Sequence, residues 1–339
     1  MSPILPVRKM IAGMYALYAI DFGIKLGLFE ALAKSEHNLP VGKLFTILEC
    51  HDDKELLMGL IRALEAVGVV HITKGKKIIF NAEWEDALTN TKSIHYLATL
   101  PECYIKPIND FHKFPYAIRH GRKLPWQSLS YSIIDAVSAD AVRSANYFIE
   151  VVANKVSGLR EKLIHGATVY DIGCAAGHST LRLAEAFPNS RFNGIDVLPR
   201  AIVLAGKNLK KSSLKNVSFK KLCATKLTPR IADVIILNDV FHEMALHLRL
   251  PALIAIRDSL KKGGGMFFSD PLSPASDKDY KKNIFKNHLI TSFFEVPYGA
   301  HVATSFEAKQ LLKQAGFKNV SVIESSENEL SLYAYGKQI

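Results

Sequence analysis

Five residues between positions 171 and 196 have the types and the spacing of a nucleoside-binding turn. Gly173, Ala175 and Gly177 stand on alternate positions, and residues this small let the backbone turn sharply and lie against a ligand. Asp171 stands just before them, and Asp196 follows a later apolar stretch. A carboxylate in that place accepts hydrogen bonds from ribose hydroxyls. The pattern therefore predicts a bound ligand that carries a ribose.

The elements around these residues form a β-α-β unit. Residues 169–172 are a short, largely apolar run with β-branched members, which is typical of a buried strand. Residues 181–187 repeat apolar side chains at helical spacing and end at Pro188. Residues 191–195 make a second strand that ends on Asp196. Nucleotide-binding folds have this order of elements: a strand, a glycine turn, a helix and a second strand that ends on an acid.

The spacing of the turn is G-x-A-x-G, whereas a dinucleotide fold prefers G-x-G-x-x-G. This stretch resembles the nucleoside-binding motif of class I S-adenosylmethionine-dependent methyltransferases. The resemblance implies that Asp171 lies near the methionine end of S-adenosylmethionine and that Asp196 holds its ribose. It also implies that the turn itself consists of Asp171, Gly173, Ala175 and Gly177.

A histidine and an acid, His242 and Glu243, follow the next long apolar stretch. Neither the paired prolines of amino-directed nucleic-acid methyltransferases nor the cysteine nucleophile of RNA carbon methylation is present here. The pair resembles the His-Asp of small-molecule O-methyltransferases, in which the histidine is the general base that deprotonates a substrate hydroxyl. With an unperturbed pKa near 6.5, His242 is expected to be mostly neutral at about pH 7.

The chain departs from that family at the base. Family members place a carboxylate shortly before a threonine on a late loop, where this chain has Val302. Glu295, His288 and His301 lie in the same region as candidate replacements. Asp270, which ends the fifth expected strand, is expected at the rim of the cleft. The resemblance therefore gives as candidate catalytic residues His242, His288 and Glu295.

A second departure concerns the adenine. The family usually has an acid after the third strand for the adenine amino group, but residues 222–225 are Leu-Cys-Ala-Thr. Either Thr225 or a backbone group must serve instead, or the affinity for adenine is lower.

Alternating strands and helices over residues 166–339 predict an α/β catalytic domain. With the first two strands, the later ones make a seven-stranded, doubly wound, Rossmann-like sheet with the ligand at the carboxyl ends of its strands. The later strands are expected at residues 217–222, 232–237, 266–269, 320–324 and 330–335.

Residues 1–95 predict a separate helical domain of the winged-helix type. Residues 54–67 carry a wide apolar stripe, and residues 69–73 and 77–80 flank a Lys-Gly-Lys turn that indicates a hairpin. The helix before the hairpin offers leucines rather than the polar side chains that enter a major groove. Burial is therefore favoured over DNA binding.

A closer resemblance covers this domain. Residues 26–34 and 56–70, with the hairpin, are similar to the dimerisation domain of small-molecule O-methyltransferases, the family of plant phenolic and bacterial antibiotic and pigment enzymes. The resemblance implies a homodimer. It also implies that residues 96–165, a helical connector, form a wall of the substrate pocket, although ordinary core packing explains any single aromatic there equally well. The aromatics are Tyr104, Phe111, Phe114, Tyr116 and Trp126.

Composition indicates a globular protein. The chain has 339 residues, of which 48% are hydrophobic and 22% charged, values ordinary for a globular protein. The apolar run at residues 10–20 is too short to span a bilayer and is expected to be a buried helix. The cysteines have neither disulfide nor metal spacing, so a cytoplasmic location without a metal centre is expected. They are Cys50, Cys103, Cys174 and Cys223.

The net charge of +11 raises the question of a nucleic-acid partner. The lysines stand in short separate groups without interleaved aromatics, so a solvated basic surface is the preferred interpretation. The function expected from the resemblance is methyl transfer from S-adenosylmethionine to a hydroxyl of a small, aromatic or polycyclic molecule. Three alternatives stay open. The first is carbon methylation of a pigment or polyketide ring, and the second is another reaction on the same ligand. The third is a winged-helix nucleic-acid-binding regulator that senses the nucleoside.

Overall fold

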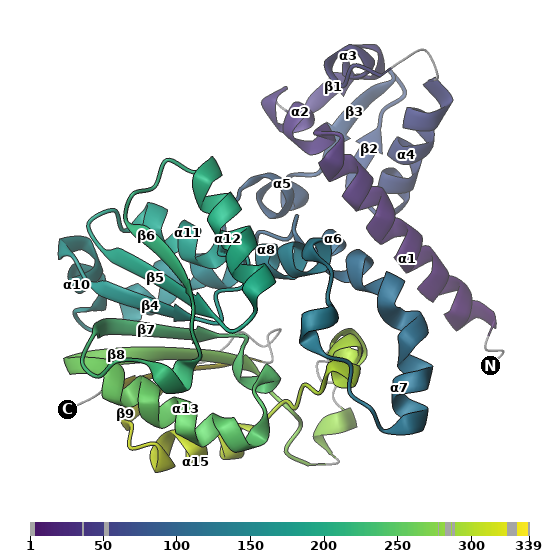
Figure 1. Cartoon of the computed structure of the whole chain (residues 1–339). Coiled ribbons are helices and arrows are strands. Elements are labelled where there is room, and N and C mark those ends of the chain that lie inside the picture. The colour runs from purple at the N-terminus through teal and green to yellow at the C-terminus, as the bar shows by residue number, and fades with distance from the viewer. Residues whose placement is uncertain are drawn as a thin grey trace. The chain divides into compact units, whose positions relative to one another are not determined.

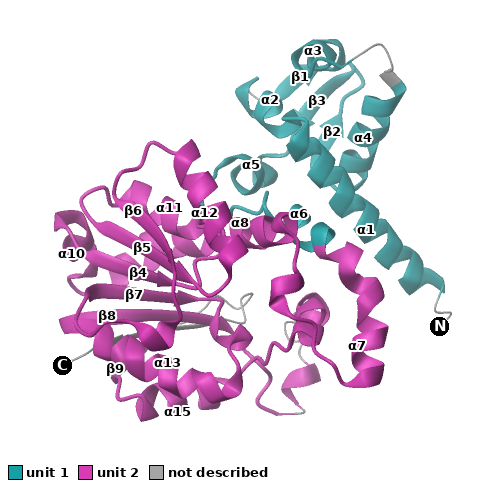
Figure 2. Ribbon diagram, viewed as in Figure 1, with its two compact units in different colours: residues 1–106 teal, residues 107–339 magenta. Residues whose placement is uncertain are grey.

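The computed structural model describes residues 4–35, 37–50, 54–276, 278–281, 286, 289–323 and 331–337. The chain divides into two compact units, Met1–Lys106 and Pro107–Ile339 (Figure 2). Each unit has its own elements and its own core.

The first unit consists of helices and a small antiparallel sheet. The sheet has the order β1-β3-β2, and the pairing of Val70 with Phe80 and of Ile72 with Ile78 confirms the predicted hairpin. Its elements are α1 (Ile4–Lys25), α2 (Leu28–Lys34), β1 (Asn38–Pro40), α3 (Val41–Ile47), α4 (Lys54–Ala66), β2 (Val70–Ile72), β3 (Lys77–Phe80), α5 (Ala82–Thr89) and α6 (Leu100–Ile105).

The apolar stripe of α4 is narrower than the sequence predicts. Leu57, Ile61 and Leu64 recur at helical spacing and are buried in the core of this unit. Leu56 and Val67, which the stripe was expected to include, remain exposed. Only one face of α4 therefore packs within the unit.

The prediction of a buried helix at residues 10–20 is confirmed for the helix and wrong for its burial. Residues 10–20 are helical within α1, but Met10 is 71% exposed, and Met14 and Tyr15 are also exposed. Burial begins only at Ala19, because the core of this unit packs against the carboxyl-terminal part of α1. The amino-terminal part of α1 presents apolar side chains with no covering partner among the described residues of this unit.

The second unit is built on a seven-stranded sheet of order β6-β5-β4-β7-β8-β10-β9. Strands β4 to β8 pair in parallel, and β10 runs antiparallel to both of its neighbours (Figure 1). This arrangement confirms the predicted Rossmann-like α/β fold. The strands are β4 (Thr168–Ile172), β5 (Arg191–Asp196), β6 (Val217–Lys221), β7 (Ala232–Asn238), β8 (Leu260–Pro271), β9 (Lys318–Ile323) and β10 (Ser331–Lys337).

Helices cover both faces of this sheet. On β7, the neighbouring residues Val234 and Ile235 belong to two different apolar clusters, as expected when successive side chains of a strand point to opposite faces. A sheet covered on both faces explains why β7 reads as a continuous apolar run. Apart from α7 (Phe114–His120), which packs against the 3-10 helix Ser292–Tyr298 rather than on the sheet, the helices described in this unit are α8 (Tyr131–Tyr147), α9 (Ala153–Lys155), α10 (Leu159–His165), α11 (His178–Ala186), α12 (Pro199–Lys211), α13 (Leu246–Ser259) and α15 (Ser305–Gln314).

The fifth strand begins earlier than predicted. Three glycines at 263–265 suggested a turn after a helix, but β8 already starts at Leu260 and runs through them. A side chain at Gly264 would lie 2.9 Å from the Lys261 carbonyl oxygen and 3.0 Å from that of Asp233. The glycines therefore allow close backbone approach where the register between β7 and β8 shifts.

Among the described residues, no helix has the length and apolar character needed to cross a membrane.

Candidate active site

The glycine turn between β4 and α11 adopts the conformation that its residues permit. Gly173, Ala175 and Gly177 all have positive φ, at 72°, 45° and 82°, a region that glycine enters readily. A side chain at Gly173 would lie 2.4 Å from Val240, in the turn that follows β7. The turn is therefore packed tightly against the segment that carries His242.

The two acids of the predicted motif hold this turn. Asp196 Oδ2 accepts a hydrogen bond from the Ala175 amide at 3.0 Å, and its Oδ1 accepts one from the Leu198 amide at 2.8 Å. Asp171 Oδ2 accepts a hydrogen bond from the Thr180 hydroxyl at 2.5 Å. Burial raises the pKa of Asp171 to about 6, with the nearby Asp196 adding to it. A carboxylate has about four acceptor sites, so Asp196 can also accept from a ligand hydroxyl.

Three residues that the sequence did not suggest support the turn from outside. The Ala176 amide donates to Ser138 Oγ at 3.0 Å, and the Ala176 carbonyl accepts from Asn208 Nδ2 at 3.1 Å. Asp135 lies 2.8 Å from His178 Nε2. Ser138 and Asp135 come from α8 and Asn208 from α12, so only tertiary packing brings them to the turn. No local sequence signal marks them.

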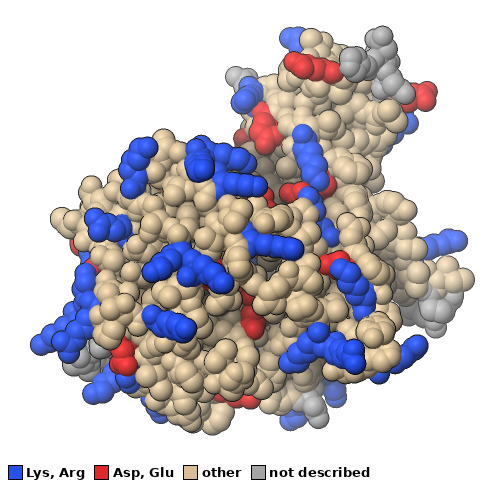
Figure 3. Space-filling view, in the orientation of Figure 1, with Lys and Arg blue, Asp and Glu red and all other residues tan. Residues whose placement is uncertain are grey.

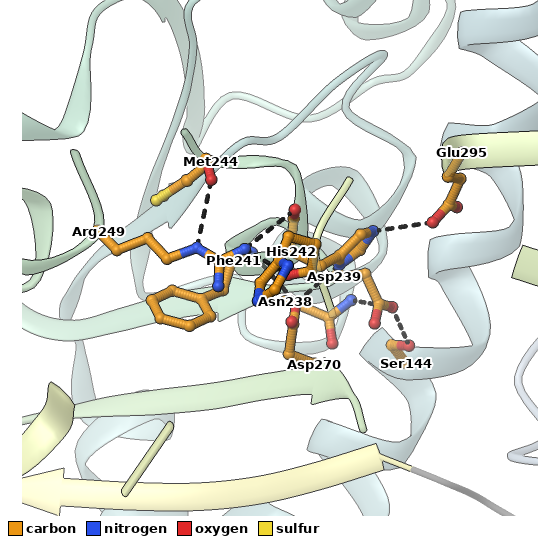
Figure 4. A network of polar contacts seen from close by, with 10 residues as sticks. Ser144, Asn238, Asp239, Phe241, His242, Met244, Arg249, Asp270 and Glu295 are labelled. Atoms are coloured by element: carbon orange, nitrogen blue, oxygen red, sulfur yellow. Dashed lines mark hydrogen bonds and ion pairs between the residues drawn. The ribbon is translucent and has the colours of Figure 1, made fainter. Parts of the chain in front are cut away.

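His242 lies in a single 3-10 turn, Phe241–Glu243, directly after β7. Its side chain is buried between two carboxylates that come from different elements (Figure 4). His242 Nδ1 is 3.0 Å from Asp270 Oδ1, and His242 Nε2 is 3.3 Å from Glu295 Oε2. Asp270 Oδ1 also accepts from the Phe241 amide at 3.1 Å. Asp270 thus fixes both the imidazole ring and the backbone of the turn that carries it.

The carboxylates determine the protonation of His242. Burial alone would lower its pKa, but Asp270 and then Glu295 outweigh burial and raise the pKa well above 6.5. The expectation of a mostly neutral imidazole is therefore wrong for the protein without ligand. Without ligand, the contacts with Asp270 and Glu295 therefore favour the protonated form of the His242 ring.

The sequence-predicted residues around the base divide into three groups. Glu295 is brought to His242, whereas His301 contributes backbone groups: its amide donates to the His242 carbonyl at 2.8 Å, and its carbonyl accepts from Arg249. Asp270 is 2% exposed, so its expected place at the rim is wrong: β8 ends beside β7 and directs the carboxylate to the histidine. His288 lies outside the described residues.

Aromatic residues hold the short 3-10 helix that carries Glu295, Ser292–Tyr298. Trp126 stacks on Tyr298 with ring centroids 5.0 Å apart, and Phe114 meets the same ring edge-on at 6.2 Å. The Tyr298 hydroxyl donates to Asp110 Oδ2 at 3.2 Å. Of the connector aromatics, Trp126 and Phe114 therefore pack in the core of the second unit and position the helix of Glu295.

Further acidic groups stand at the carboxyl ends of the strands. Burial raises the pKa of Glu243 to about 8 and that of Asp239 to about 6. The buried Oδ1 atom of Asn238 has no hydrogen-bond partner among the described residues. Several crowded carboxyl groups and one unpaired acceptor favour a ligand that brings positive charge and hydrogen-bond donors. S-adenosylmethionine, with a sulfonium and an ammonium group, fits that requirement.

The acid that binds adenine in the family follows the third strand, and this chain has no acid at the corresponding place after β6. Residues 224–226 form a 3-10 turn, and Thr225 Oγ1 lies 3.2 Å from Cys223 Sγ. No acidic side chain stands between residues 222 and 226.

Residues 164–316 match the family model of a methyltransferase domain. An uncharacterised protein of Rickettsia prowazekii is 27% identical over 117 residues, which are 34% of this chain and 47% of that protein. The chain therefore spans less than half of the length of this curated relative.

Solved structures share the fold over the whole chain. Human N-acetylserotonin methyltransferase, solved in complex with S-adenosylmethionine, has a TM-score of 0.66 at 17% identity, covering 100% of this chain and 98% of that one. An O-methyltransferase family protein from Burkholderia thailandensis has a TM-score of 0.68 at 16% identity, with 100% and 98% covered. Residues 164–316 therefore match a methyltransferase domain, as the resemblance predicted, and the whole chain has the fold of these solved methyltransferase structures.

Proposed function

We propose that this enzyme transfers a methyl group from S-adenosylmethionine to a hydroxyl of a small molecule, with His242 as general base. S-adenosylmethionine is the methyl donor. The observation that carries the proposal is the position of His242 Nε2, which lies 3.3 Å from Glu295. His242 stands in the turn after β7, and Val240 of the same segment packs against the glycine turn. A base in that position meets an acceptor placed at the carboxyl ends of the strands.

Each residue then has a definite task. The glycine turn, Asp171 and Asp196 bind the cofactor, which supplies a methyl group on an already positive sulfur. Glu295 orients the acceptor hydroxyl beside His242, and Nε2 accepts the proton as the oxygen attacks. Asp270 stabilises the imidazolium that results, because its carboxylate lies 3.0 Å from Nδ1. Orientation and proton removal are the main contributions required of the protein.

His242 must lose a proton before it can act. The two carboxylates favour the imidazolium, whereas a positive ligand nearby disfavours it. Cofactor binding therefore prepares the histidine as a base.

We propose an aromatic or polycyclic acceptor. Phe293 and Phe111 are partly exposed, at 48% and 37%, next to the buried Phe114 ring, which lies 6.0 Å from Phe293 and 5.0 Å from Phe111. Phe293 stands on the same 3-10 helix as Glu295. Partly exposed aromatic side chains on the helix of Glu295 and next to Phe114 suit stacking of a planar substrate.

We also propose that the enzyme acts as a homodimer joined through residues 10–95. The exposed apolar side chains of α1 support this, since contiguous apolar surface marks association sites. A cytoplasmic location is supported by four free thiols. On the face drawn in Figure 3, lysine and arginine side chains stand in separate groups, which supports the proposal that nucleic acid is not the partner.

The proposed reaction is tested by incubating the enzyme and S-adenosylmethionine with a metabolite extract. The expected product gains the mass of one CH₂ per methyl group and has one exchangeable hydrogen fewer than its precursor, as counted by mass spectrometry in D₂O. A ring-methylated product retains every exchangeable hydrogen and would overturn hydroxyl transfer in favour of carbon methylation. A mobility-shift assay with duplex DNA over a salt series tests the nucleic-acid alternative, because phosphate contacts weaken steeply with salt.

A further inference from the structure

We infer that Arg249, on α13, is the residue that positions the proposed base. The role assigned to His242 rests on the proposed function, but the contacts of Arg249 do not. Arg249 Nη2 donates to the His242 carbonyl at 3.2 Å and also to the His301 carbonyl, and Nε donates to the Met244 carbonyl at 3.2 Å. One side chain thus joins the turn of the base to the loop that follows the helix of Glu295.

The same side chain contacts the turn from a second direction. The Arg249 guanidinium lies over the Phe241 ring, 4.5 Å from its centroid (Figure 4), a distance typical of cation–π contacts. The Phe241 amide is in turn bound by Asp270. Asp270 therefore fixes the imidazole ring, while Arg249 holds the His242 and Met244 carbonyls and packs on the Phe241 ring.

The chemistry of arginine explains the choice of residue. Arg249 is 2% exposed, and no carboxylate lies within ion-pairing distance of it among the described residues. Burial lowers its pKa, which reflects the cost of this location. A planar group with five donors can reach several carbonyl oxygens at once, whereas the ammonium of lysine is a point charge on a flexible stem. The fork geometry, rather than the charge, is what holds the two segments.

The variant Arg249→Lys separates these two properties, since it retains the charge and loses the fork. Histidine-selective ¹⁵N NMR over a pH series, with the His242 signal assigned from His242→Ala, measures the pKa of the base without a methyl acceptor. We expect the pKa of His242 to fall by about one pH unit, because a loosened turn weakens the charge-assisted hydrogen bond to Asp270. Arg257→Lys, the same change on the same helix, should leave it unchanged, because Arg257 contacts Asp258 and the Ala315 carbonyl instead.

An unchanged or higher pKa of His242 in folded Arg249→Lys would overturn the inference. If that variant does not fold, the unmodified protein decides. Its Arg249 guanidinium should then give separate, slowly exchanging N–H signals, and a single averaged signal would contradict the contacts. A different result would contradict the proposed function. A fully active His242→Ala enzyme would show that His242 is not the base, and it would not bear on the contacts by which Arg249 positions the His242 ring in the unmodified protein.

Discussion

The Glu295 carboxylate faces His242 Nε2 at 3.3 Å, the nitrogen that takes the acceptor's proton in the proposed function. The carboxylate comes from a late 3-10 helix and the imidazole from the turn after β7. In the proposed reaction the acceptor replaces this contact, with its oxygen bound by Glu295 and its proton directed at the ring.

His242→Ala is expected to lower kcat about 10²–10⁴-fold on a non-acidic hydroxyl, the usual contribution of a positioned base. The acidic limb of the rate against pH should disappear, because that limb reports protonation of the imidazole. The affinity for S-adenosylmethionine should hardly change. Full activity in this variant would refute the base assignment, and His288→Ala would be the next to measure.

Glu295→Gln retains the shape of the side chain and removes one of the two anions beside His242. Because Glu295 raises the pKa of the imidazole, we expect the acidic limb of kcat/KM to move to lower pH. The exposed Glu161→Gln on α10 is the matched control and should leave the limb in place. A limb that stays at its original pH in Glu295→Gln would show that the contact is absent in solution.

The sheet was predictable because its signals are local. The apolar run of β7, the glycine turn and the acid at Asp196 each lie within a few residues of sequence, and the periodicity of strands and helices follows from burial. The same holds for the hairpin of β2 and β3. Each of these predictions depends on side-chain character along one element.

The environment of the base was less predictable because it is tertiary. Asp270 was expected at a rim, yet the parallel pairing of β7 with β8 brings its carboxylate to His242. Glu295 was only one of several candidates, and the aromatic contacts that place its helix come from residues 114 and 126. The protonation of the imidazole depends on both carboxylates, so it too could not be read from residue type.

Asp196→Ala is expected to weaken the binding of S-adenosylmethionine's demethylated product. Titration calorimetry measures this affinity. Each charge-assisted hydrogen bond lost to a ribose hydroxyl costs about 1.5–3 kcal/mol. Because Asp196 also holds the Ala175 amide, the conservative Asp196→Asn separates the two roles: its amide oxygen can still accept from that amide. Unchanged affinity in Asp196→Ala would remove the ribose assignment.

The chain is expected to scatter light as a dimer of its 37.6 kDa subunit at micromolar concentration. Met10 and Met14 are exposed one helical turn apart on α1, so replacing both with lysine should shift the equilibrium to the monomer. Circular dichroism should show that the helix content is retained, because neither side chain is part of the core of the first unit. A monomeric unmodified protein would contradict the proposed association.

Stability is expected to fall as pH rises through the neutral range. Burial raises the pKa of Glu243 from 4.5 to about 8, so between these values the folded protein retains a proton that the unfolded chain has lost. Asp171, raised to about 6, and His242, raised well above 6.5, act in the same direction. Since the folded state binds more protons, the free energy of unfolding decreases with rising pH.

Glu243→Gln isolates the largest contribution among the carboxyl groups of this site. The amide has nearly the same shape and does not titrate, so the melting temperature of the variant should depend less on pH than that of the unmodified protein. The difference should be greatest between mildly acidic pH and about pH 8, the pKa of Glu243 in the folded protein. Glu161→Gln, at an exposed carboxylate, serves as the control. Equal slopes for Glu243→Gln and the unmodified protein would show that Glu243 is already ionised when the protein is folded.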